Sequence, residues 1–101
     1  MVPQKILVVD DEEAIRTVVA RHLTRLGHEV TTAGDGAAAL TEFRQRPVDL
    51  LITDLNMPRM SGVELVKTLK THDPGLMVIV LTGYGDMSSA IEVLRGGCDD
   101  Y

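Results

Sequence analysis

Three aspartates stand directly after apolar, strand-like segments, and their carboxylates are the groups in this chain best suited to chemistry. Asp10 and Asp11 follow the segment Lys5–Val9, and Asp54 follows the segment Val48–Thr53. Open parallel sheets bind ligands at the carboxyl ends of their strands. If these two segments are neighbouring strands, the three carboxylates converge on one rim of the sheet.

The mutual repulsion of three carboxylates that lie close together must be offset. Two unit charges about 4 Å apart repel by roughly 4 kcal/mol at an effective dielectric of 20. A divalent cation offsets that cost, and Mg²⁺ takes hard oxygen ligands, keeps several waters and often shares phosphate oxygens. The three aspartates therefore predict a Mg²⁺ site that works with a phosphate group.

Helix capping is the alternative interpretation of Asp10 and Asp11. Aspartates at a helix N-terminus accept hydrogen bonds from free N–H groups and complement the helix dipole. For this pair alone both interpretations stay open. Asp54 ends a second apolar strand and has no capping role in sight, which favours the metal site.

The elements that position these residues follow from the alternation of short β-branched runs with helical periodicities, which predicts βα units around a parallel sheet. The expected strands are Lys5–Val9, Glu29–Ala33 at an edge, Val48–Thr53 and Leu76–Leu81, with a fifth beginning at Asp99–Tyr101.

Helices are predicted between these strands. The first carries an apolar stripe at helical spacing and ends at Gly27, where a left-handed cap is wanted. The third opens with a capping box, in which the Ser61 hydroxyl meets free N–H groups and Glu64 reaches back. The residues on which the helices are predicted are Ile15, Val18, Val19, Leu23 and Leu26 for the first, Ala38, Ala39, Leu40 and Phe43 for the second, Leu65, Val66 and Leu69 for the third, and Met87–Arg95 for the fourth.

Length and composition predict a single domain over residues 1–101, since 101 residues with 45% hydrophobic and 25% charged residues suit one ordinary globular core. The net charge of −5 disfavours direct nucleic acid binding. No apolar stretch approaches the roughly 20 residues of a membrane span, and no secretory signal is visible. The single cysteine, Cys98, fits a reducing compartment, so the expected location is the cytoplasm.

Four motifs together give the chain a resemblance to a known family. They are Val8-Val9-Asp10-Asp11-Glu12, Asp54-Leu55-Asn56-Met57-Pro58 with Gly62, Leu81-Thr82-Gly83, and Gly96-Gly97-Cys98-Asp99-Asp100-Tyr101. The chain resembles, over essentially its whole length, the receiver domains of two-component response regulators. The resemblance implies a doubly wound α/β fold with a flavodoxin-like parallel sheet in the strand order 2-1-3-4-5.

The resemblance also implies roles for single residues at the rim. Asp54 looks like the phosphoryl acceptor and a metal ligand. Asp11 looks like the direct Mg²⁺ ligand, Asp10 like its partner acting through metal-bound water, and Asn56 like the residue whose backbone carbonyl binds the metal.

Two further positions resemble the family's switch. Thr82 looks like the hydroxyl that swings to a phosphoryl oxygen, and Tyr101 like the aromatic side chain whose rotamer follows Thr82. Together with the acceptor, they would couple phosphorylation to a change of shape.

One departure from the family concerns its lysine. The family has a lysine followed by proline just after the last strand, and no residue of this sequence matches it; Lys5, Lys67 and Lys70 lie on other predicted elements. The domain is therefore expected to be C-terminally incomplete, lacking the end of strand five and helix five. We expect weaker phosphorylation, lower stability and a tendency to form homodimers, compared with a chain that extends through the lysine.

The expected function is signalling rather than enzymatic turnover. A histidine kinase or phosphotransfer protein would phosphorylate Asp54, and the conformational change would control an output domain or a partner. Two alternatives stay open: a metal-dependent phosphotransferase or phosphatase with an aspartyl phosphate, for which Asn56 is unsuited as the general acid, and an interaction module that cannot be phosphorylated because the lysine is missing.

Overall fold

The computed structural model of the protein describes residues 2–54 and 60–81. The predicted helix Met87–Arg95 and the strand expected from Asp99 lie outside these residues. In chain order, the described elements are β1 (Lys5–Val9), α1 (Glu13–Arg25), β2 (Glu29–Ala33), α2 (Gly36–Gln45), β3 (Leu50–Asp54), α3 (Gly62–His72) and β4 (Met77–Leu81).

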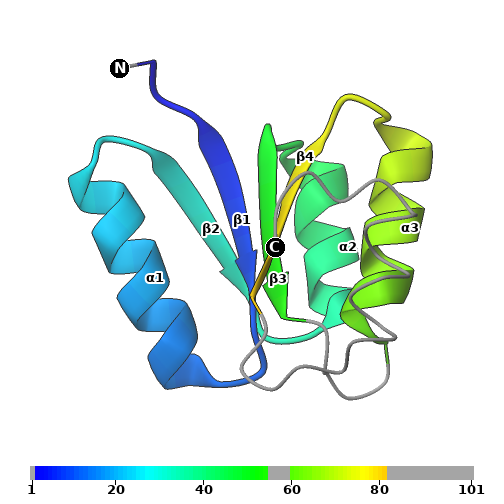
Figure 1. Ribbon diagram of the computed structural model, residues 1–101, viewed down its shortest axis with the longest axis horizontal. Coiled ribbons are helices and arrows are strands. Elements are labelled where there is room, and N and C mark those ends of the chain that lie inside the picture. Colours follow the sequence, from blue (N-terminus) through cyan, green and yellow to red (C-terminus); the bar gives the residue numbers. More distant parts are fainter. Residues whose placement is uncertain (1, 55–59, 82–101) are drawn as a thin grey trace.

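The four described strands form a parallel sheet in the order β2-β1-β3-β4. This confirms the predicted order 2-1-3-4, while the expected fifth strand lies outside the described residues. The register pairs Val9 with Ala33 on one side and with Thr53 on the other, and it pairs Asp54 with Leu81. All four carboxyl ends therefore meet at one edge, at the bottom of Figure 1.

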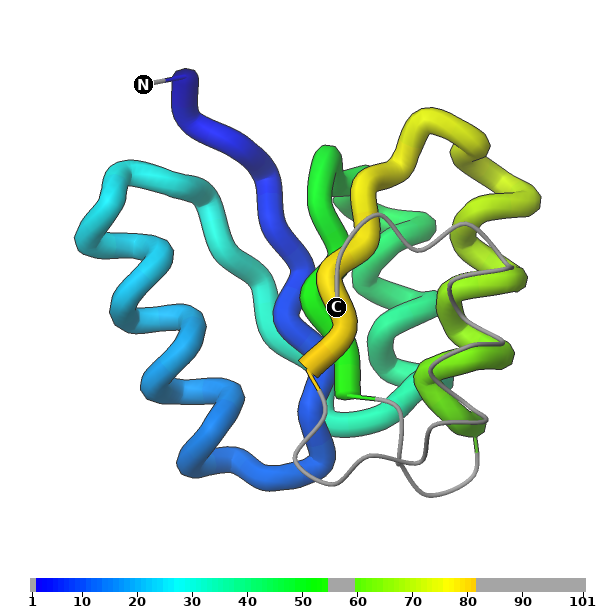
Figure 2. Tube along the Cα trace, in the orientation of Figure 1, coloured from blue at the N-terminus to red at the C-terminus, as the bar shows by residue number. Residues whose placement is uncertain are grey.

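Helices cover both faces of the sheet. Helix α1 lies on one face, and α2 and α3 lie side by side on the other (Figures 1 and 2). Side chains of β1 alternate accordingly: Leu7 and Val9 belong to the core under α2 and α3, whereas Ile6 and Val8 belong to the core under α1. The strand is apolar because it is buried on both sides.

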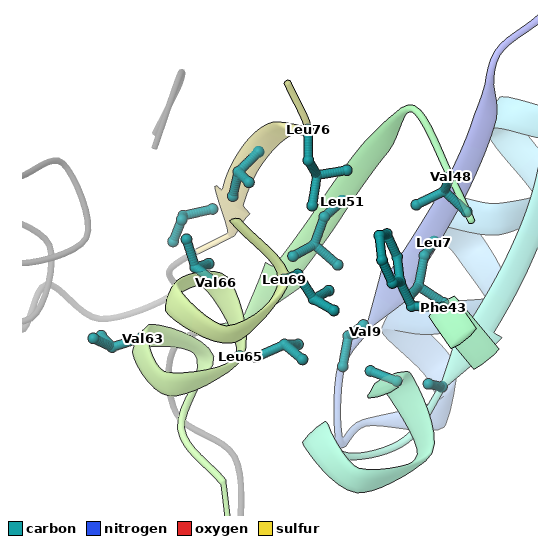
Figure 3. Close-up of a cluster of buried hydrophobic side chains, with 14 residues drawn as sticks. Leu7, Val9, Phe43, Val48, Leu51, Val63, Leu65, Val66, Leu69 and Leu76 are labelled. Carbon is teal, nitrogen blue, oxygen red and sulfur yellow. The ribbon is translucent and has the colours of Figure 1, made fainter. Parts of the chain in front are cut away.

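The two cores differ in depth. The core under α2 and α3 holds fourteen buried residues, among them Phe43, Leu51 and Leu69, which Figure 3 shows between the two helices and the sheet. The core under α1 holds three buried residues, Ile6, Val8 and Ile52, with half-buried side chains around them. Most of the described hydrophobic burial therefore lies on the α2 and α3 side.

Helix α1 corrects one implication of the sequence pattern. Of its predicted apolar stripe, Val19 and Leu23 pack on the smaller core, while Ile15, Val18 and Leu26 are 40%, 66% and 46% exposed. The helix has no fully buried residue. The reason is geometric: Val19 and Leu23, four residues apart, lie on the line where the helix touches the sheet, and the flanks of the stripe stay outside it.

Local signals at the helix ends are confirmed. Gly27 has a φ of 97°, which is the left-handed conformation that follows many helices. The Ser61 hydroxyl accepts a hydrogen bond from the Glu64 N–H at 3.2 Å, as predicted for the serine of the capping box. Asp35 caps α2 in the same way, accepting from the Ala38 N–H at 2.8 Å.

The end of β3 differs from the sequence prediction by a residue that matters. The strand was expected to stop at Thr53, but the parallel ladder includes Asp54. Because the backbone of Asp54 pairs with Leu81 of β4, the position of this aspartate is fixed by the sheet rather than by a loop. None of the described helices is long and apolar enough to span a membrane.

Candidate functional site

Asp10, Asp11 and Asp54 come together at the carboxyl edge of the sheet. One carboxylate oxygen from each residue lies within 4.8 Å of the oxygens of the other two. Asp10 and Asp11 follow β1, Asp54 ends β3, and these strands are hydrogen-bonded neighbours. The convergence predicted from the sequence is confirmed, because parallel pairing places both strand ends on the same side.

The three aspartates differ in their exposure to solvent. Asp10 is buried, with 3% of its surface exposed, Asp54 is half-buried and Asp11 is exposed. We call these three residues the acidic cluster. Asp10 forms its buried side, and Asp11 lies on the side open to solvent. This arrangement leaves room for an ion that keeps part of its water shell.

Hydrogen bonds fix the turn that carries Asp10. Its N–H donates to the Ala33 carbonyl at 3.2 Å, which ties the turn to the end of β2. Its carboxylate accepts from the Glu12 N–H at 2.8 Å, next to the start of α1. Asp10 therefore fixes the local turn and also belongs to the acidic cluster. It does not cap α1, because the N-cap residue is Glu12 and no side chain among the described residues makes the cap hydrogen bond.

The protonation of Asp10 reflects this environment. Burial raises the pKa of the Asp10 carboxyl above its ordinary value of 3.8, the hydrogen bond from the Glu12 N–H opposes that rise, and the charges of Asp54, Asp11 and Glu12 add to it. A negative charge on Asp10 is thus disfavoured without a compensating cation. The donor set consists of carboxylate oxygens from the turn after β1 and from the end of β3, which fits Mg²⁺.

Three of the predicted site residues lie outside the described residues: Asn56, Thr82 and Tyr101. Their expected roles as carbonyl ligand, switch hydroxyl and aromatic switch stay predictions. The described part of β4 ends at Leu81, in register with Asp54. The lysines that were considered as substitutes for the family lysine lie on other parts of the structure, Lys5 at the opposite end of β1 and Lys67 and Lys70 on α3.

Sequence reasoning missed Arg16, a residue of α1 close to the cluster. Its guanidinium Nη1 donates a hydrogen bond to the backbone carbonyl of Asp10 at 2.8 Å. The sequence signal was weak, since an arginine in the first turns of a helix is ordinary and its partner is a main-chain atom.

The parallel sheet with the order 2-1-3-4, helices on both faces and an acidic cluster at the carboxyl edge define a CheY-like receiver fold. The family model of the response regulator receiver domain matches residues 6–101. The chain therefore belongs to the response regulator receiver domain family, which functions in two-component signalling and whose members are not enzymes in the classical sense.

Curated relatives agree with this assignment. The chain is 37% identical over 99 residues to the probable transcriptional regulatory protein TcrX of Mycobacterium tuberculosis, covering 98% of this chain and 42% of that protein. It is 40% identical over 98 residues to the probable transcriptional regulator ycf27 of Cyanophora paradoxa, covering 97% of this chain and 41% of that protein. The chain thus spans less than half the length of these relatives.

A solved structure supports the fold. A CheY-like response regulator receiver domain protein from Methanospirillum hungatei JF-1 superposes with a TM-score of 0.94 at 30% identity, covering 99% of this chain and 80% of that chain.

Proposed function

We propose that the protein accepts a phosphoryl group on Asp54 in a Mg²⁺-dependent reaction and passes the signal on by changing conformation. The observation that carries the proposal is the meeting of three carboxylates within 4.8 Å at the ends of two neighbouring strands, in a chain of the receiver family. The phosphodonor is the phosphohistidine of a histidine kinase or of a phosphotransfer protein.

The residues of the acidic cluster have two roles, metal binding and nucleophilic attack. Asp10, Asp11 and Asp54 would hold the ion, together with the backbone carbonyl of Asn56. Held there, Mg²⁺ would neutralise the charge of the carboxylates and of the phosphoryl oxygens. An Asp54 oxygen attacks phosphorus, the new O–P bond forms as the P–N bond of phosphohistidine breaks, and the electron pair of that bond stays with the imidazole.

The attack depends on where Asp54 is held. Its backbone is part of the ladder with Leu81, so the sheet holds the Cα from which its carboxylate projects. Phosphoryl transfer needs in-line positioning and charge neutralisation more than covalent help, and a backbone held by the sheet supports the positioning.

The consequence of phosphorylation is assigned by resemblance. Thr82 contacts a phosphoryl oxygen, Tyr101 changes its rotamer with Thr82, and residues 1–101 act as one receiver domain in the cytoplasm. The curated relatives TcrX and ycf27 are longer and are named as probable transcriptional regulators. An output domain of that kind, rather than this acidic segment, would contact DNA.

The test uses acetyl phosphate as the phosphodonor and intact mass as the readout. With Mg²⁺, the wild-type protein should gain one phosphoryl group, and Asp54→Asn should gain none. Asp49→Asn is the matched control: Asp49 follows α2 at the opposite end of the sheet, and its carboxylate accepts from the Lys5 N–H at 3.0 Å, which asparagine can still do. This variant should be labelled like the wild type.

Two other outcomes would overturn the proposal. No labelling of the wild type, with or without Mg²⁺, would leave an interaction module. Continuous hydrolysis of external phosphoesters, without a stable adduct on Asp54, would instead indicate a phosphatase.

A further inference from the structure

Arg16 connects two turns at the rim of the sheet. Its Nη1 donates to the Asp10 carbonyl at 2.8 Å, in the turn between β1 and α1. A Cβ added to Gly34, in the turn between β2 and α2, would lie 3.1 Å from the same nitrogen. The guanidinium thus sits against both turns, and the absence of a side chain at residue 34 leaves space for it.

The hydrogen bond from Arg16 reaches the main chain of the acidic cluster. The Asp10 carbonyl belongs to the peptide unit that joins Asp10 to Asp11. The other groups of Asp10 are held by neighbours, its N–H by the Ala33 carbonyl and its carboxylate by the Glu12 N–H. Arg16 completes this set by fixing the peptide plane from which the exposed side chain of Asp11 projects.

We propose that Arg16 is a positioning residue for the metal site, holding the Asp10–Asp11 peptide so that both carboxylates meet Asp54, and that Gly34 provides the space for its guanidinium. The proposal rests on the proposed function for the identity of the ion, Mg²⁺. Arg16 acts through Asp10 and Asp11 and is not itself a ligand.

The sign of the effect separates positioning from simple charge. A guanidinium near a divalent cation repels it, so loss of the arginine charge alone would tighten Mg²⁺ binding. Loss of a hydrogen bond that orients the ligands weakens metal binding, commonly by about tenfold or more. For Arg16 we expect a loss of Mg²⁺ affinity on the order of tenfold. The two explanations predict opposite changes.

Gly34→Ala tests the same contact without changing any charge. Gly34 does not have a positive φ, so alanine is compatible with its backbone. The added methyl group would lie 3.1 Å from Nη1, so the guanidinium must shift by a few tenths of an ångström, which perturbs its hydrogen bond to the Asp10 carbonyl. Gly75→Ala is its control, because a Cβ there would make an ordinary 3.4 Å contact with Asp73, far from the rim.

The first measurement is a Mg²⁺ titration of the protein without a phosphodonor, followed by calorimetry or by amide NMR shifts. The Kd for Mg²⁺ should rise about tenfold in Arg16→Ala and by a smaller factor in Gly34→Ala. Arg16→Lys keeps a cationic donor and should recover part of the affinity. Arg25→Ala, an exposed arginine in the last turn of α1, should bind Mg²⁺ like the wild type.

The second measurement separates metal binding from the transfer step. With acetyl phosphate, the Mg²⁺ concentration at half-maximal rate should rise in Arg16→Ala and Gly34→Ala, while the rate at saturating Mg²⁺ should equal that of the wild type. A purely structural role would lower the melting temperature of these variants and leave their Mg²⁺ dependence unchanged, and that result would overturn the proposal.

The remaining outcomes are also decisive. Tighter Mg²⁺ binding by Arg16→Ala would assign the residue a charge effect and reject positioning. A wild type that binds Mg²⁺ with the expected variant effects but is not phosphorylated would sink the proposed function and leave the role of Arg16 intact. A wild type that does not bind Mg²⁺ would overturn both.

Discussion

At the scale of single residues, Asp10 bears the electrostatic cost of the acidic cluster. Burial is the largest cause that raises the pKa of its carboxyl, and the charges of Asp54, Asp11 and Glu12 raise that pKa further. Its folded state therefore binds a proton more tightly than its unfolded state. The linked stability is fully present below pH 3.8, and it is lost as the pH rises through the raised pKa.

Asp10→Asn should consequently melt at a higher temperature than the wild type in Mg²⁺-free buffer at pH 7. Asparagine removes the disfavoured charge and can still accept the hydrogen bond from the Glu12 N–H. The difference in melting temperature should shrink as the pH falls through the raised pKa of Asp10 toward 3.8, because the wild-type carboxyl then becomes neutral.

Added Mg²⁺ provides the control for this comparison. The ion should raise the melting temperature of the wild type, since it binds the folded state, and raise that of Asp10→Asn less. An Asp10→Asn variant that is less stable than the wild type at pH 7 without Mg²⁺ would contradict the inference that the charge of Asp10 destabilises the folded protein.

The acidic cluster could be predicted from the sequence because it depends on a simple rule: Asp10, Asp11 and Asp54 follow apolar strands, and parallel strands end on one side. Arg16 could not be predicted in the same way. Its contacts are a main-chain carbonyl and the space above Gly34, and neither leaves a pattern of residue types.

At the scale of elements, the start of α2 packs against the segment that follows the acceptor strand. Gly36 is the first residue of α2, and a Cβ there would lie 2.6 Å from the Met60 Cβ and 2.8 Å from its Sδ. Met60 is also packed against the larger core. The close approach of these residues requires a glycine at position 36.

Gly36→Ala should therefore destabilise the protein, against the ordinary preference for alanine in helices. Helix propensity favours alanine over glycine by about 1 kcal/mol, but overpacking commonly costs about 1–3 kcal/mol. Because the clash involves the Cβ of Met60 as well as its flexible end, we expect a net loss of about 1 kcal/mol in the free energy of unfolding.

Urea denaturation measures this loss, and Met60→Gly in the Gly36→Ala background tests its cause. The second substitution removes the clashing side chain, so it should cost less in that background than in the wild type. Equal costs of Met60→Gly in both backgrounds would show that the two residues do not interact.

The helix ends were predictable where the signal is local, as at Ser61 with Glu64 at the start of α3 and at Gly27 after the end of α1. The contact between Gly36 and Met60 was not, because it joins two elements that are far apart in the chain. The partial burial of α1 was also not predictable. The helical spacing of Ile15 and Val18 shows that they share a face with Val19, but it does not show how much of that face the sheet covers.

At the scale of the whole molecule, the described residues place more buried side chains on the α2 and α3 side of the sheet than on the α1 side. Two adjacent leucines of β3 pack on opposite sides of the sheet. Leu51 is fully buried in the core under α2 and α3, whereas Leu50 is half-buried and packs on the core under α1. The two residues have the same type and lie on the same strand, so they form a matched pair.

Leu51→Ala should lower the free energy of unfolding by about 2–5 kcal/mol, as fully buried leucines do, because a cavity remains that its rigid neighbours cannot fill. Leu50→Ala should cost about 1–2 kcal/mol, since it removes less surface from contact with the protein. Urea unfolding of both variants checks the difference. Equal losses would mean that the side under α1 is packed as tightly as the other.

The acidic residues are attached to β1 and β3, which are the two inner strands of the described sheet. Local opening of a sheet usually starts at its borders, and among the described strands β2 lies at a border, with only β1 paired to it. The amides of β1 and β3 should therefore exchange with solvent deuterium more slowly than those of β2. Partial fraying of the fold at β2 can then occur while the carboxylates stay assembled, so the lifetime of the ion-binding geometry is set by the slowest-opening part of the protein.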